Sequence, residues 1–515
     1  MMTTSTSAVR LSSVLKGIYP LDDTWDRELG GITLDSRRVE KGTLFMACKG
    51  AHHDGRQFVD QAIANGAAAI LVEADDADWN FEHERAGVPV LPIINLHEQM
   101  AQLAARFYGE PGRTMRLIGV TGTNGKTTTT QLLAAALSAA GYRCGVIGTL
   151  GNGMSGAALA DNGDGPGTTP DAVAMQRILA TLQAQRADNV VMEVSSHALD
   201  QRRVLVDDYT IAVFTNLSRD HLDYHGDMET YGSAKRRLFH GRGLQLAILN
   251  YDDEYTRATE RVLGGEVRCF TWSVNNAAAD VHATSIAFLP HGIELDVHTP
   301  WGSFALASPL LGSFNVSNLL AVLTTLLASE SLEQGFDPAR LVAITAALKP
   351  VVGRMQLIEG YPVTAVIDYA HTPDGLANAL QAVREHCRGR LWCVVGCGGE
   401  RDRGKRPQMA ALTETHADVV VLTDDNPRGE ASTVILADMQ AGLKSPMRAH
   451  VIADRRQAIA FALGTAAAGD VVLIAGKGHE QYQEVNGTRQ PFSDAEVATG
   501  VLRSRFGNGR QEVRA

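Results

Sequence analysis

A strand–turn–helix–strand pattern limits the fold of this chain more than any other feature of its sequence. In RLIGVTGTNGKTTTTQLLAAALSAAGYRCGVIGT, which begins at Arg116, an apolar run leads into a glycine-rich turn, an Ala/Leu-rich segment follows, and a second apolar run ends the segment. This order predicts a βαβ unit with parallel strands. Further apolar runs at Val190–Val194, Ile211–Leu217 and Ala247–Asn250 extend the prediction to an α/β fold with a mostly parallel sheet.

The glycine-rich turn of this unit predicts a phosphate-binding loop. Its glycines let backbone N–H groups turn inward, and the N-terminus of the following helix adds partial positive charge. Lys126 is placed to reach the β and γ phosphates of a nucleotide, and Thr127 to bind Mg²⁺. The strict G-x-x-x-x-G-K-[ST] pattern would need glycine at Val120, so this is a variant loop. A plain glycine turn is the alternative, but the strand, the helix and the Lys-Thr pair favour nucleotide binding. The loop comprises Gly122, Thr123, Asn124, Gly125, Lys126, Thr127 and Thr128.

The chain of 515 residues is long enough for several domains, at about 150 residues each. We predict three, at residues 1–98, 99–349 and 350–515. The first contains short strands and a helix over Gln57–Asn65, which Gly66 ends. The third repeats the alternation of strands and helices, and its strands end in polar, glycine-rich loops. In open α/β sheets, ligands bind at this carboxyl edge.

Charge and cysteine content narrow the partners and the compartment. The 47 basic and 58 acidic residues give a net charge of −11, which argues against a general binder of nucleic acid or anionic lipid. The six cysteines are scattered, and the spacing of Cys393 and Cys397 does not favour a zinc site, so we expect reduced thiols. The start MMTTSTSAVR lacks the pattern of a signal peptide, and no apolar run approaches the length of a membrane span. We therefore expect a cytoplasmic protein without membrane insertion.

Charged groups near predicted strand ends suggest further site residues. Glu193 ends the run VVMEV beside the phosphate loop, where a carboxylate is placed to hold Mg²⁺. Ser195 to His197 follow it, and substrate hydrogen bonding is favoured over a Ser-His hydrolase because no G-x-S-x-G elbow is present. Lys235 lies on a probable helix and, taken alone, would be a solvated surface residue. In the third block, Arg401 stands where a dinucleotide motif needs glycine, so we expect an anion-binding loop, lined by Arg401, Arg403, Lys405 and Arg406.

The ordered motifs together resemble those of the Mur ligase family. They are TGTNGKTT, EVSSHALDQRR, NLSRDHLDYHG with Lys235 beyond it, FNVSN, DYAHTPD, GGERDRGKRP, TDDNPR and AGKGHE. The resemblance covers essentially the whole chain and is closest to the members that add the third residue of the peptidoglycan stem peptide. The phosphate loop alone is shared with folylpolyglutamate synthases. The family implies an N-terminal UDP-binding α/β domain, a central P-loop ATPase and a C-terminal Rossmann-like domain for the amino acid.

The resemblance implies an ATP-dependent amide ligase that works through an acyl phosphate and needs Mg²⁺. Its substrates would be ATP, UDP-MurNAc-L-Ala-D-Glu and meso-diaminopimelate, and we expect a monomer without a nucleic-acid partner. Lys235 would be carbamylated to N6-carboxylysine and would bind metal with Thr127 and Glu193. The implied catalytic residues are Lys126, Glu193, His221 and Lys235.

The resemblance also implies three sets of ligand-binding residues. Beside the phosphate loop, ATP would contact Asn315, Asn318, Asp368 and His371. The UDP-MurNAc-dipeptide would contact Leu34, Ser36, Ala51, His52, His53, Thr168, Thr169, Ser195, Gln201 and Arg203. Diaminopimelate would contact Arg401, Asp425, Asn426, Pro427, Arg428, Gly476 and Glu480.

Specificity depends on the DNPR motif that ends at Arg428. An arginine there matches the second carboxylate of diaminopimelate, which lysine lacks. A lysine-adding Mur ligase remains an alternative, and a folylpolyglutamate-synthase-like ligase a less favoured one, since such an enzyme would lack DNPR and the UDP-binding block. A regulatory ATP-binding protein on the same scaffold should have lost Lys126, Glu193 or Lys235, and all three are present.

Overall fold

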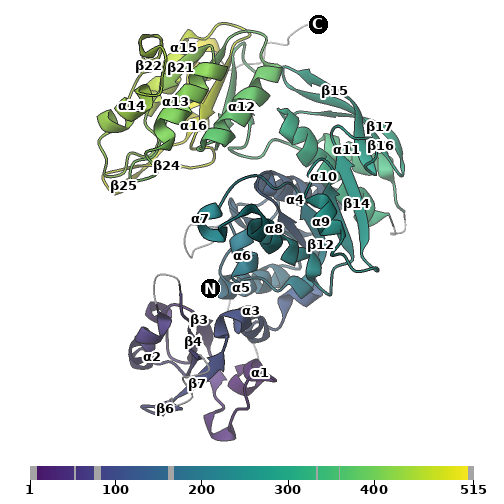
Figure 1. Cartoon of the computed structure of the whole chain (residues 1–515), viewed down its shortest axis with the longest axis vertical. Helices are drawn as coiled ribbons and strands as arrows, with labels where there is room; N and C mark the ends of the chain where they lie inside the picture. The colour runs from purple at the N-terminus through teal and green to yellow at the C-terminus, as the bar shows by residue number, and fades with distance from the viewer. Residues whose placement is uncertain are drawn as a thin grey trace. The chain divides into compact units, whose positions relative to one another are not determined.

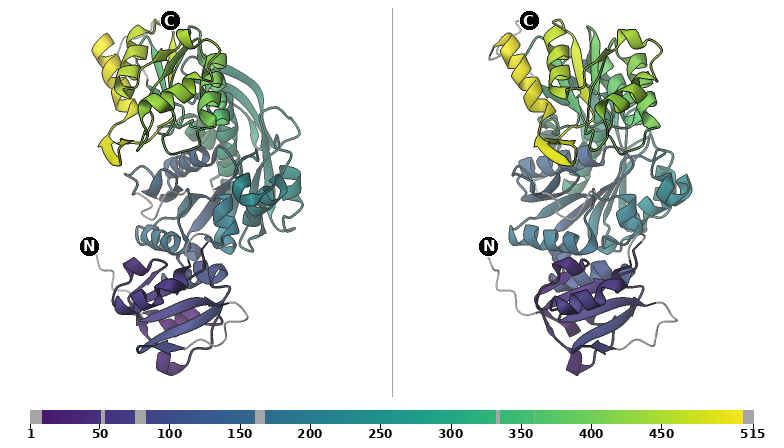
Figure 2. Two further views of the ribbon diagram at one scale, coloured as in Figure 1. Left: turned by 60° about the vertical axis from the view of Figure 1, so that its left-hand side comes forward. Right: turned by 90° about the vertical axis from the view of Figure 1, so that its left-hand side faces the viewer.

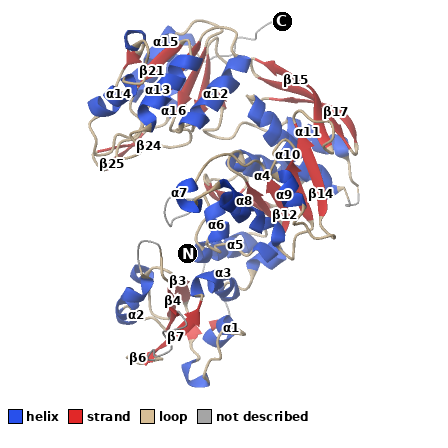
Figure 3. Ribbon diagram, in the orientation of Figure 1, coloured by secondary structure: helices blue, strands red, loops and turns tan. Residues whose placement is uncertain are grey.

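The structure is a computed structural model that describes residues 9–50, 54–74, 83–160, 168–331, 335–358 and 360–507. The chain forms two compact units, Met1–Thr271 and Trp272–Ala515. Helices and strands are mixed throughout both units, which confirms the predicted α/β class (Figures 1 and 3). The three predicted domains divide the chain more finely than these two units, and their boundaries stay a prediction.

The first unit begins with a five-stranded sheet in the order β3-β4-β5-β7-β6, preceded by the small β1-β2 pair. Neighbouring strands are parallel from β3 to β7, and β6 is antiparallel to β7. Successive residues of β4 face opposite layers: Leu44 packs with α1 and α3, and Phe45 packs with α2. The elements are β1 Val9–Arg10, α1 Leu11–Leu15, β2 Glu28–Leu29, β3 Gly31–Thr33, β4 Thr43–Ala47, α2 Val59–Ala64, β5 Ala69–Ala74, β6 Glu84–Arg85, β7 Val88–Ile94 and α3 Leu96–Phe107.

The predicted helix at Gln57 begins two residues later in the structure, at Val59. Asp54 accepts a hydrogen bond from the backbone N–H of Arg56 and caps a 3-10 turn over Gly55–Phe58. This turn takes the place of the first predicted helical residues. Gly66 has φ +94°, which confirms the predicted end of the helix.

The central sheet of the first unit contains the phosphate loop. Within the first unit its strands run in the order β10-β9-β11-β8-β12-β13-β14; those from β9 to β13 are parallel, and β10 is antiparallel to β9. The strand predicted over Ile211–Leu217 ends at Phe214, three residues before its predicted end. The elements are β8 Arg116–Thr121, α4 Lys126–Ala140, β9 Cys144–Gly148, β10 Gly151–Met154, α5 Ala172–Ala184, β11 Asn189–Glu193, α6 Ser196–Asp200, β12 Tyr209–Phe214, α7 Leu222–His225, α8 Met228–Arg236, β13 Leu246–Asn250, α9 Thr256–Glu260 and β14 Arg268–Ser273, which runs into the second unit.

The second unit opens with three antiparallel strands that the sequence prediction did not include. β15 pairs with β16, and β16 with β17. The buried indole of Trp272 donates to Ser317 on α10 at 3.1 Å and so connects this part to a long buried helix. The elements are β15 Val281–Leu289, β16 Gly292–Thr299, β17 Gly302–Ser308, α10 Ser313–Glu330 and α11 Pro338–Ala346.

The C-terminal sheet of the second unit has helices on both faces (Figure 2). Its strand order is β18-β19-β23-β20-β21-β22, parallel except for β18. Val366 packs in the layer of α12, α13 and α14, and its neighbour Ile367 packs in the layer of α15 and α16. The elements are β18 Gln356–Ile358, β19 Thr364–Asp368, α12 Pro373–His386, β20 Leu391–Val395, α13 Lys405–His416, β21 Val419–Leu422, α14 Ser432–Gln440, β22 His450–Val451, α15 Arg455–Thr465, β23 Val471–Ala475, α16 Asp494–Phe506 and the hairpin β24 Tyr482–Val485 with β25 Thr488–Pro491.

All six cysteines are free. Within the described residues, no helix combines the length and apolar character that crossing a membrane requires.

Candidate active site

The phosphate loop lies between the carboxyl end of β8 and the N-terminus of α4. Gly122 has φ +145°, and a Cβ there would lie 1.9 Å from the Thr215 hydroxyl, so the loop requires glycine at this position. Gly125 has φ +83° and precedes the first helical residue, Lys126. The Lys126 ammonium donates to the carbonyls of Gly122 at 2.9 Å and Thr123 at 2.8 Å. It is therefore held over the loop, where a nucleotide's phosphates would bind.

A buried carboxylate, Glu193, connects this loop to two neighbouring strand ends. Glu193 is the last residue of β11 and is 1% exposed, so it is not a surface residue. Its carboxylate accepts hydrogen bonds from the hydroxyl of Thr127 at 2.9 Å and from the backbone N–H of Thr149 at 2.7 Å. Thr149, which follows β9, also donates its hydroxyl at 3.1 Å. The structure thus brings together Thr127 and Glu193, the two predicted Mg²⁺ ligands, and adds Thr149, which no sequence signal identified.

These oxygen atoms are a suitable donor set for Mg²⁺, which prefers hard oxygen ligands. The described part of the chain contains no group of three or more His, Cys, Asp or Glu side chains that would hold a metal by themselves. An ion beside Thr127 and Glu193 would therefore take further ligands from a bound nucleotide, as Mg²⁺ commonly does.

Lys235 is buried, although it would be a surface lysine on helix position alone. It lies on α8, is 1% exposed, and its Nζ donates to the carbonyl of Gly122 at 2.7 Å. The Tyr231 ring, which the sequence did not flag, lies 4.4 Å from this Nζ. Burial, and secondarily the nearby Lys126, hold the pKa of Lys235 well below its ordinary value. The neutral amine is thereby favoured at a position next to the phosphate loop.

Four of the predicted dipeptide-binding residues form one hydrogen-bonded chain. The Thr169 hydroxyl donates to the Glu193 carbonyl at 2.9 Å and accepts from the backbone N–H of Ser195 at 3.1 Å. Arg203 donates to the Thr169 carbonyl at 3.3 Å and to the Gln201 side-chain oxygen at 2.9 Å. Thr168 joins through Thr149, whose hydroxyl lies 3.3 Å from its own. The structure thus brings this predicted set together beside Glu193.

His221 lies at the start of α7 with a left-handed backbone, φ +52°. Its ring meets that of His197 edge to face at a centroid distance of 4.9 Å, and the His197 ring also meets Tyr224 at 4.3 Å. Tyr224 accepts a hydrogen bond from Gln201 at 3.1 Å and donates to Asp200 at 2.9 Å. Burial lowers the pKa of His197. The DHLDYH segment therefore packs against the predicted dipeptide-binding residues, a contact that the sequence analysis did not predict.

One of the predicted UDP-binding residues, Leu34, lines a cavity of about 540 Å³ within the first unit. Asp35, Tyr108 and Asp171 line it as well. Ser36 is buried and its hydroxyl donates to Gln61 at 2.9 Å, so in this structure it stabilises the loop. Ala51, His52 and His53 lie outside the described residues.

Among the predicted ATP contacts of the second unit, Asn315 and Asn318 are buried, Asp368 is half-buried and His371 is exposed, and each has a hydrogen-bond partner within the unit. Asn315 donates to the Leu311 carbonyl at 2.7 Å and accepts from Asn318 at 2.9 Å. Asp368, the last residue of β19, accepts from the N–H groups of Met355 and Ala370, each at 2.8 Å, and burial raises its pKa. His371 accepts at its backbone carbonyl from Lys405 at 2.8 Å, and partial desolvation lowers the pKa of its ring.

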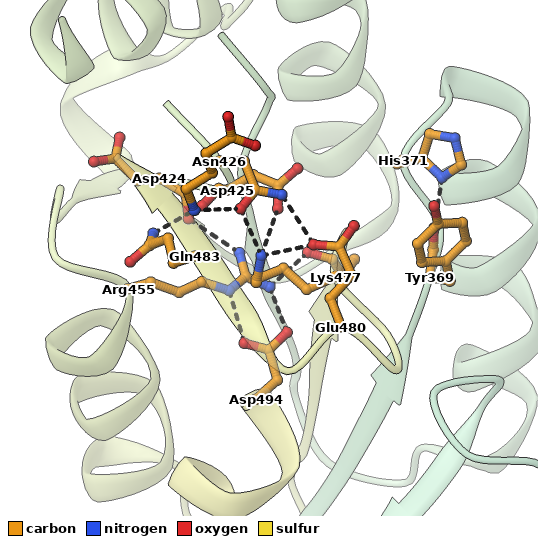
Figure 4. Close-up of polar contacts among 12 residues, drawn as sticks. Tyr369, His371, Asp424, Asp425, Asn426, Arg455, Lys477, Glu480, Gln483 and Asp494 are labelled. Atoms are coloured by element: carbon orange, nitrogen blue, oxygen red, sulfur yellow. Dashed lines mark hydrogen bonds and ion pairs between the residues drawn. The ribbon is translucent and has the colours of Figure 1, made fainter. Parts of the chain in front are cut away.

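The DNPR loop and the GKGHE loop meet at the carboxyl edge of the C-terminal sheet (Figure 4). Asn426 donates to Glu480 at 2.9 Å, and the backbone N–H of Glu484 donates to Asn426 at 3.0 Å. Arg428 has φ +52°, donates to the Gly399 carbonyl at 2.8 Å and lies 3.8 Å from the Glu484 carboxylate. Of the remaining predicted contacts, Gly476 has φ +118° and lies close to Asp425.

Two of the four cations in the predicted anion-binding loop, Arg403 and Arg406, form ion pairs with carboxylates from outside the loop. Arg406 is buried and pairs with Glu430 at 2.7 Å and Asp438 at 2.8 Å, and Arg403 also pairs with Glu430. Lys405 contacts the His371 carbonyl. The expectation of a four-cation loop was therefore wrong, because carboxylates distant in sequence already bind two of its members. Arg401 is exposed.

Three family models match the chain in succession. They describe the Mur ligase family catalytic domain over residues 28–108, the Mur ligase middle domain over residues 120–326, and the Mur ligase glutamate ligase domain over residues 353–478. A protein of Pseudomonas aeruginosa named UDP-N-acetylmuramoyl-L-alanyl-D-glutamate--2,6-diaminopimelate ligase is 48% identical over 475 residues, which cover 92% of this chain and 94% of that protein.

The chain belongs to the Mur ligase family.

Two further comparisons support this assignment over nearly the full length of the chain. A protein of Coxiella burnetii with the same name is 45% identical over 484 residues, 93% of this chain and 96% of that protein. A solved structure of a ligase of that name superposes with a TM-score of 0.71 at 38% identity, covering 97% of this chain and 99% of that one. The resemblance inferred from the motifs is confirmed, and so is the predicted Mur-ligase α/β fold.

Substituting Gly122 by alanine should abolish tight ATP binding without unfolding the protein. The new Cβ would collide with Thr215 and with the backbone of Asn216 at 3.0 Å, so the loop would have to move. We expect ATP affinity to fall by at least about tenfold, measured by isothermal titration calorimetry, since backbone N–H groups would be misdirected. Gly265→Ala is the matched control, because that exposed glycine has nothing within 4 Å of its added Cβ. Unchanged affinity in Gly122→Ala would contradict the assignment of this loop.

Proposed function

We propose that this chain is an ATP-dependent ligase that joins meso-diaminopimelate to the γ-carboxylate of the D-glutamyl residue in UDP-N-acetylmuramoyl-L-alanyl-D-glutamate, in peptidoglycan precursor synthesis. Two features that occur together in this chain support the proposal. A phosphate loop with Lys126 and Thr127 is bonded to a buried Glu193, and a DNPR loop carries Arg428. Relatives that are named for this activity match more than nine-tenths of the chain.

Phosphoryl transfer is the first step and needs mainly positioning and charge neutralisation. The γ-carboxylate oxygen attacks the γ-phosphorus of ATP, ADP leaves, and an acyl phosphate forms. Lys126, held over the loop by two carbonyls, neutralises phosphate charge. Bound Mg²⁺ would offset the repulsion between the carboxylate and the phosphate. Thr127 and Glu193 are the residues that would hold it.

Amide formation is the second step. The amine of diaminopimelate attacks the acyl carbon, phosphate leaves, and the nitrogen loses a proton. Arg428 would bind the carboxylate at the far end of diaminopimelate, and Glu480 would bind the ammonium beside it. The chain Thr169–Arg203–Gln201 would hold the dipeptide end of the other substrate.

Lys235 would enter the reaction as a carbamate. Its neutral amine adds to CO₂, giving a carbamate anion and releasing one proton. The burial of this amine beside Gly122 supports the proposal, because an anion there would face the phosphate loop and serve as a metal ligand.

The proposed reaction is tested by phosphate release with ATP, Mg²⁺ and the UDP-MurNAc-dipeptide. We expect release to depend on meso-diaminopimelate, with lysine a much poorer substrate, because lysine lacks the carboxylate that Arg428 would bind. Absence of diaminopimelate-dependent release would refute the proposal. Preferential turnover of lysine would refute only the specificity and would favour the lysine-adding alternative.

Arg428→Ala should raise the KM for diaminopimelate and leave that for ATP unchanged. Loss of the partner of a buried carboxylate costs on the order of 2–5 kcal/mol, which is roughly 30-fold to several-thousand-fold in affinity. Steady-state kinetics with each substrate varied in turn measure this effect. Arg448→Ala, at an exposed arginine of the same unit, should change neither KM. An unchanged KM for diaminopimelate in Arg428→Ala would exclude the proposed contact.

Lys235→Ala should lose ligation while ATP binding is retained, and short-chain carboxylic acids should restore part of the activity by supplying the missing anion. The lowered pKa leaves more neutral amine at neutral pH than in an ordinary lysine, so the carbamate should form in the wild type at that pH. Nuclear magnetic resonance with isotopically labelled bicarbonate detects it directly. Full activity of Lys235→Ala, or no labelled carbamate in an active wild type, would overturn this role.

A further inference from the structure

Lys477 is a buried cation of the GKGHE loop that contacts the DNPR loop, and none of the roles above uses it. Its side chain is 0% exposed. The ammonium donates to the side-chain oxygen of Asn426 at 2.9 Å and to the carboxylate of Glu480 at 2.8 Å, and the Asp425 carboxylate lies 3.7 Å away (Figure 4). A buried ammonium is costly unless it is paired and hydrogen-bonded, so this contact fixes the position of its partners.

The contacts on Glu480 all fall on one of its two oxygens. Oε2 accepts from Lys477 and also from the amide of Asn426 at 2.9 Å. Among the described residues, Oε1 has no hydrogen-bond donor, and the side chain is 19% exposed. Lys477 and Asn426 therefore orient the carboxylate and leave Oε1 to accept a hydrogen bond from a ligand.

The charges around Lys477 favour a cationic ligand. Lys477 faces two carboxylates, Asp425 and Glu480, and cannot neutralise both. The neighbouring Arg455 is already bound by Asp494 through two hydrogen bonds of 2.7 Å, with both side chains 0% exposed. Counted as ionised, the three carboxylates Asp425, Glu480 and Asp494 exceed these two cations by one, which favours a ligand that carries an ammonium.

The buried ion pair of Arg455 and Asp494 holds the backbone of both the DNPR loop and the GKGHE loop. The Arg455 guanidinium donates to the carbonyl of Asp424 at 3.2 Å and to that of Ala475 at 3.0 Å. These residues directly precede Asp425 and Gly476. Since the backbone is held independently of Lys477, the distinctive contribution of Lys477 is to orient the Glu480 side chain.

We propose that Lys477 is a positioning residue that orients Glu480 toward the ammonium at the far end of the incoming amino acid, and so determines the preference for a substrate with that second ammonium. This inference rests on the proposed function. Lys477 touches neither the reacting carbonyl nor the ATP phosphates in this scheme, and it acts only through Glu480 and Asn426.

The test compares meso-diaminopimelate with 2-aminopimelate, which keeps both carboxylates but lacks the second ammonium. In the wild type, we expect a higher kcat/KM for diaminopimelate. Lys477→Met should reduce this preference by at least about tenfold through KM, with the KM values for ATP and the UDP-MurNAc-dipeptide unchanged. Glu480→Gln should reduce the preference similarly, and Lys477→Met/Glu480→Gln should lose no more than the single variants, since both act on one contact.

A purely structural role would give a different result. If Lys477→Met lowered kcat/KM equally for both amino acids, the preference would be unchanged and the inference would be overturned. Lys444→Met, at an exposed lysine of the same unit, is the matched control and should change nothing. If Lys477→Met does not fold, Lys477→Gln undergoes the same comparison, and an unchanged preference there overturns the inference. A wild type without diaminopimelate-dependent phosphate release would instead refute the proposed function.

Discussion

The buried carboxylate of Glu193 is the constraint on which the phosphate-binding region depends. A carboxylate at 1% exposure is stable only when donors surround it, and here they come from the start of α4 and from the segment after β9. Gly148 must lack a side chain, because a Cβ there would lie 2.2 Å from the Glu193 oxygen. The backbone carbonyl of Glu193 binds Thr169 in addition. Three loops that are separate in sequence therefore take their positions from one residue at the end of β11.

In the C-terminal sheet, the loops at the carboxyl edge are held by buried cations instead of a buried carboxylate. Arg455 and Lys477 are buried cations at the carboxyl ends of its strands, and each binds carboxylates and carbonyls of the neighbouring loops. In both units, a buried ion holds loop backbone that has no regular secondary structure to stabilise it. Loops that are already held by such hydrogen bonds lose less conformational entropy when a ligand binds.

The sequence predicted those parts of the molecule that depend on local patterns. Glycines, Lys126 and the apolar runs located the phosphate loop, and Glu193 was correctly placed at a strand end. Thr149 and Tyr224 were missed because their importance comes from contacts with residues distant in sequence. The antiparallel strands were missed although β16 alternates between buried and exposed residues, which is a usable period-two signal. Arg406 was misjudged because Glu430 and Asp438 lie beyond any local window.

Lys235 shows why the position of a lysine on a helix does not by itself predict whether its side chain is exposed. Its helix has a mixed face on which Tyr231, Ala234 and Lys235 are all buried, so the lysine points inward with the apolar residues. Both Lys235 and Lys126 donate to the Gly122 carbonyl, and two ammonium groups sharing one acceptor repel each other. The repulsion and the burial act in the same direction, since both disfavour charge on Lys235. The lowered pKa of Lys235 therefore favours its neutral amine, the form that the proposed carbamate requires.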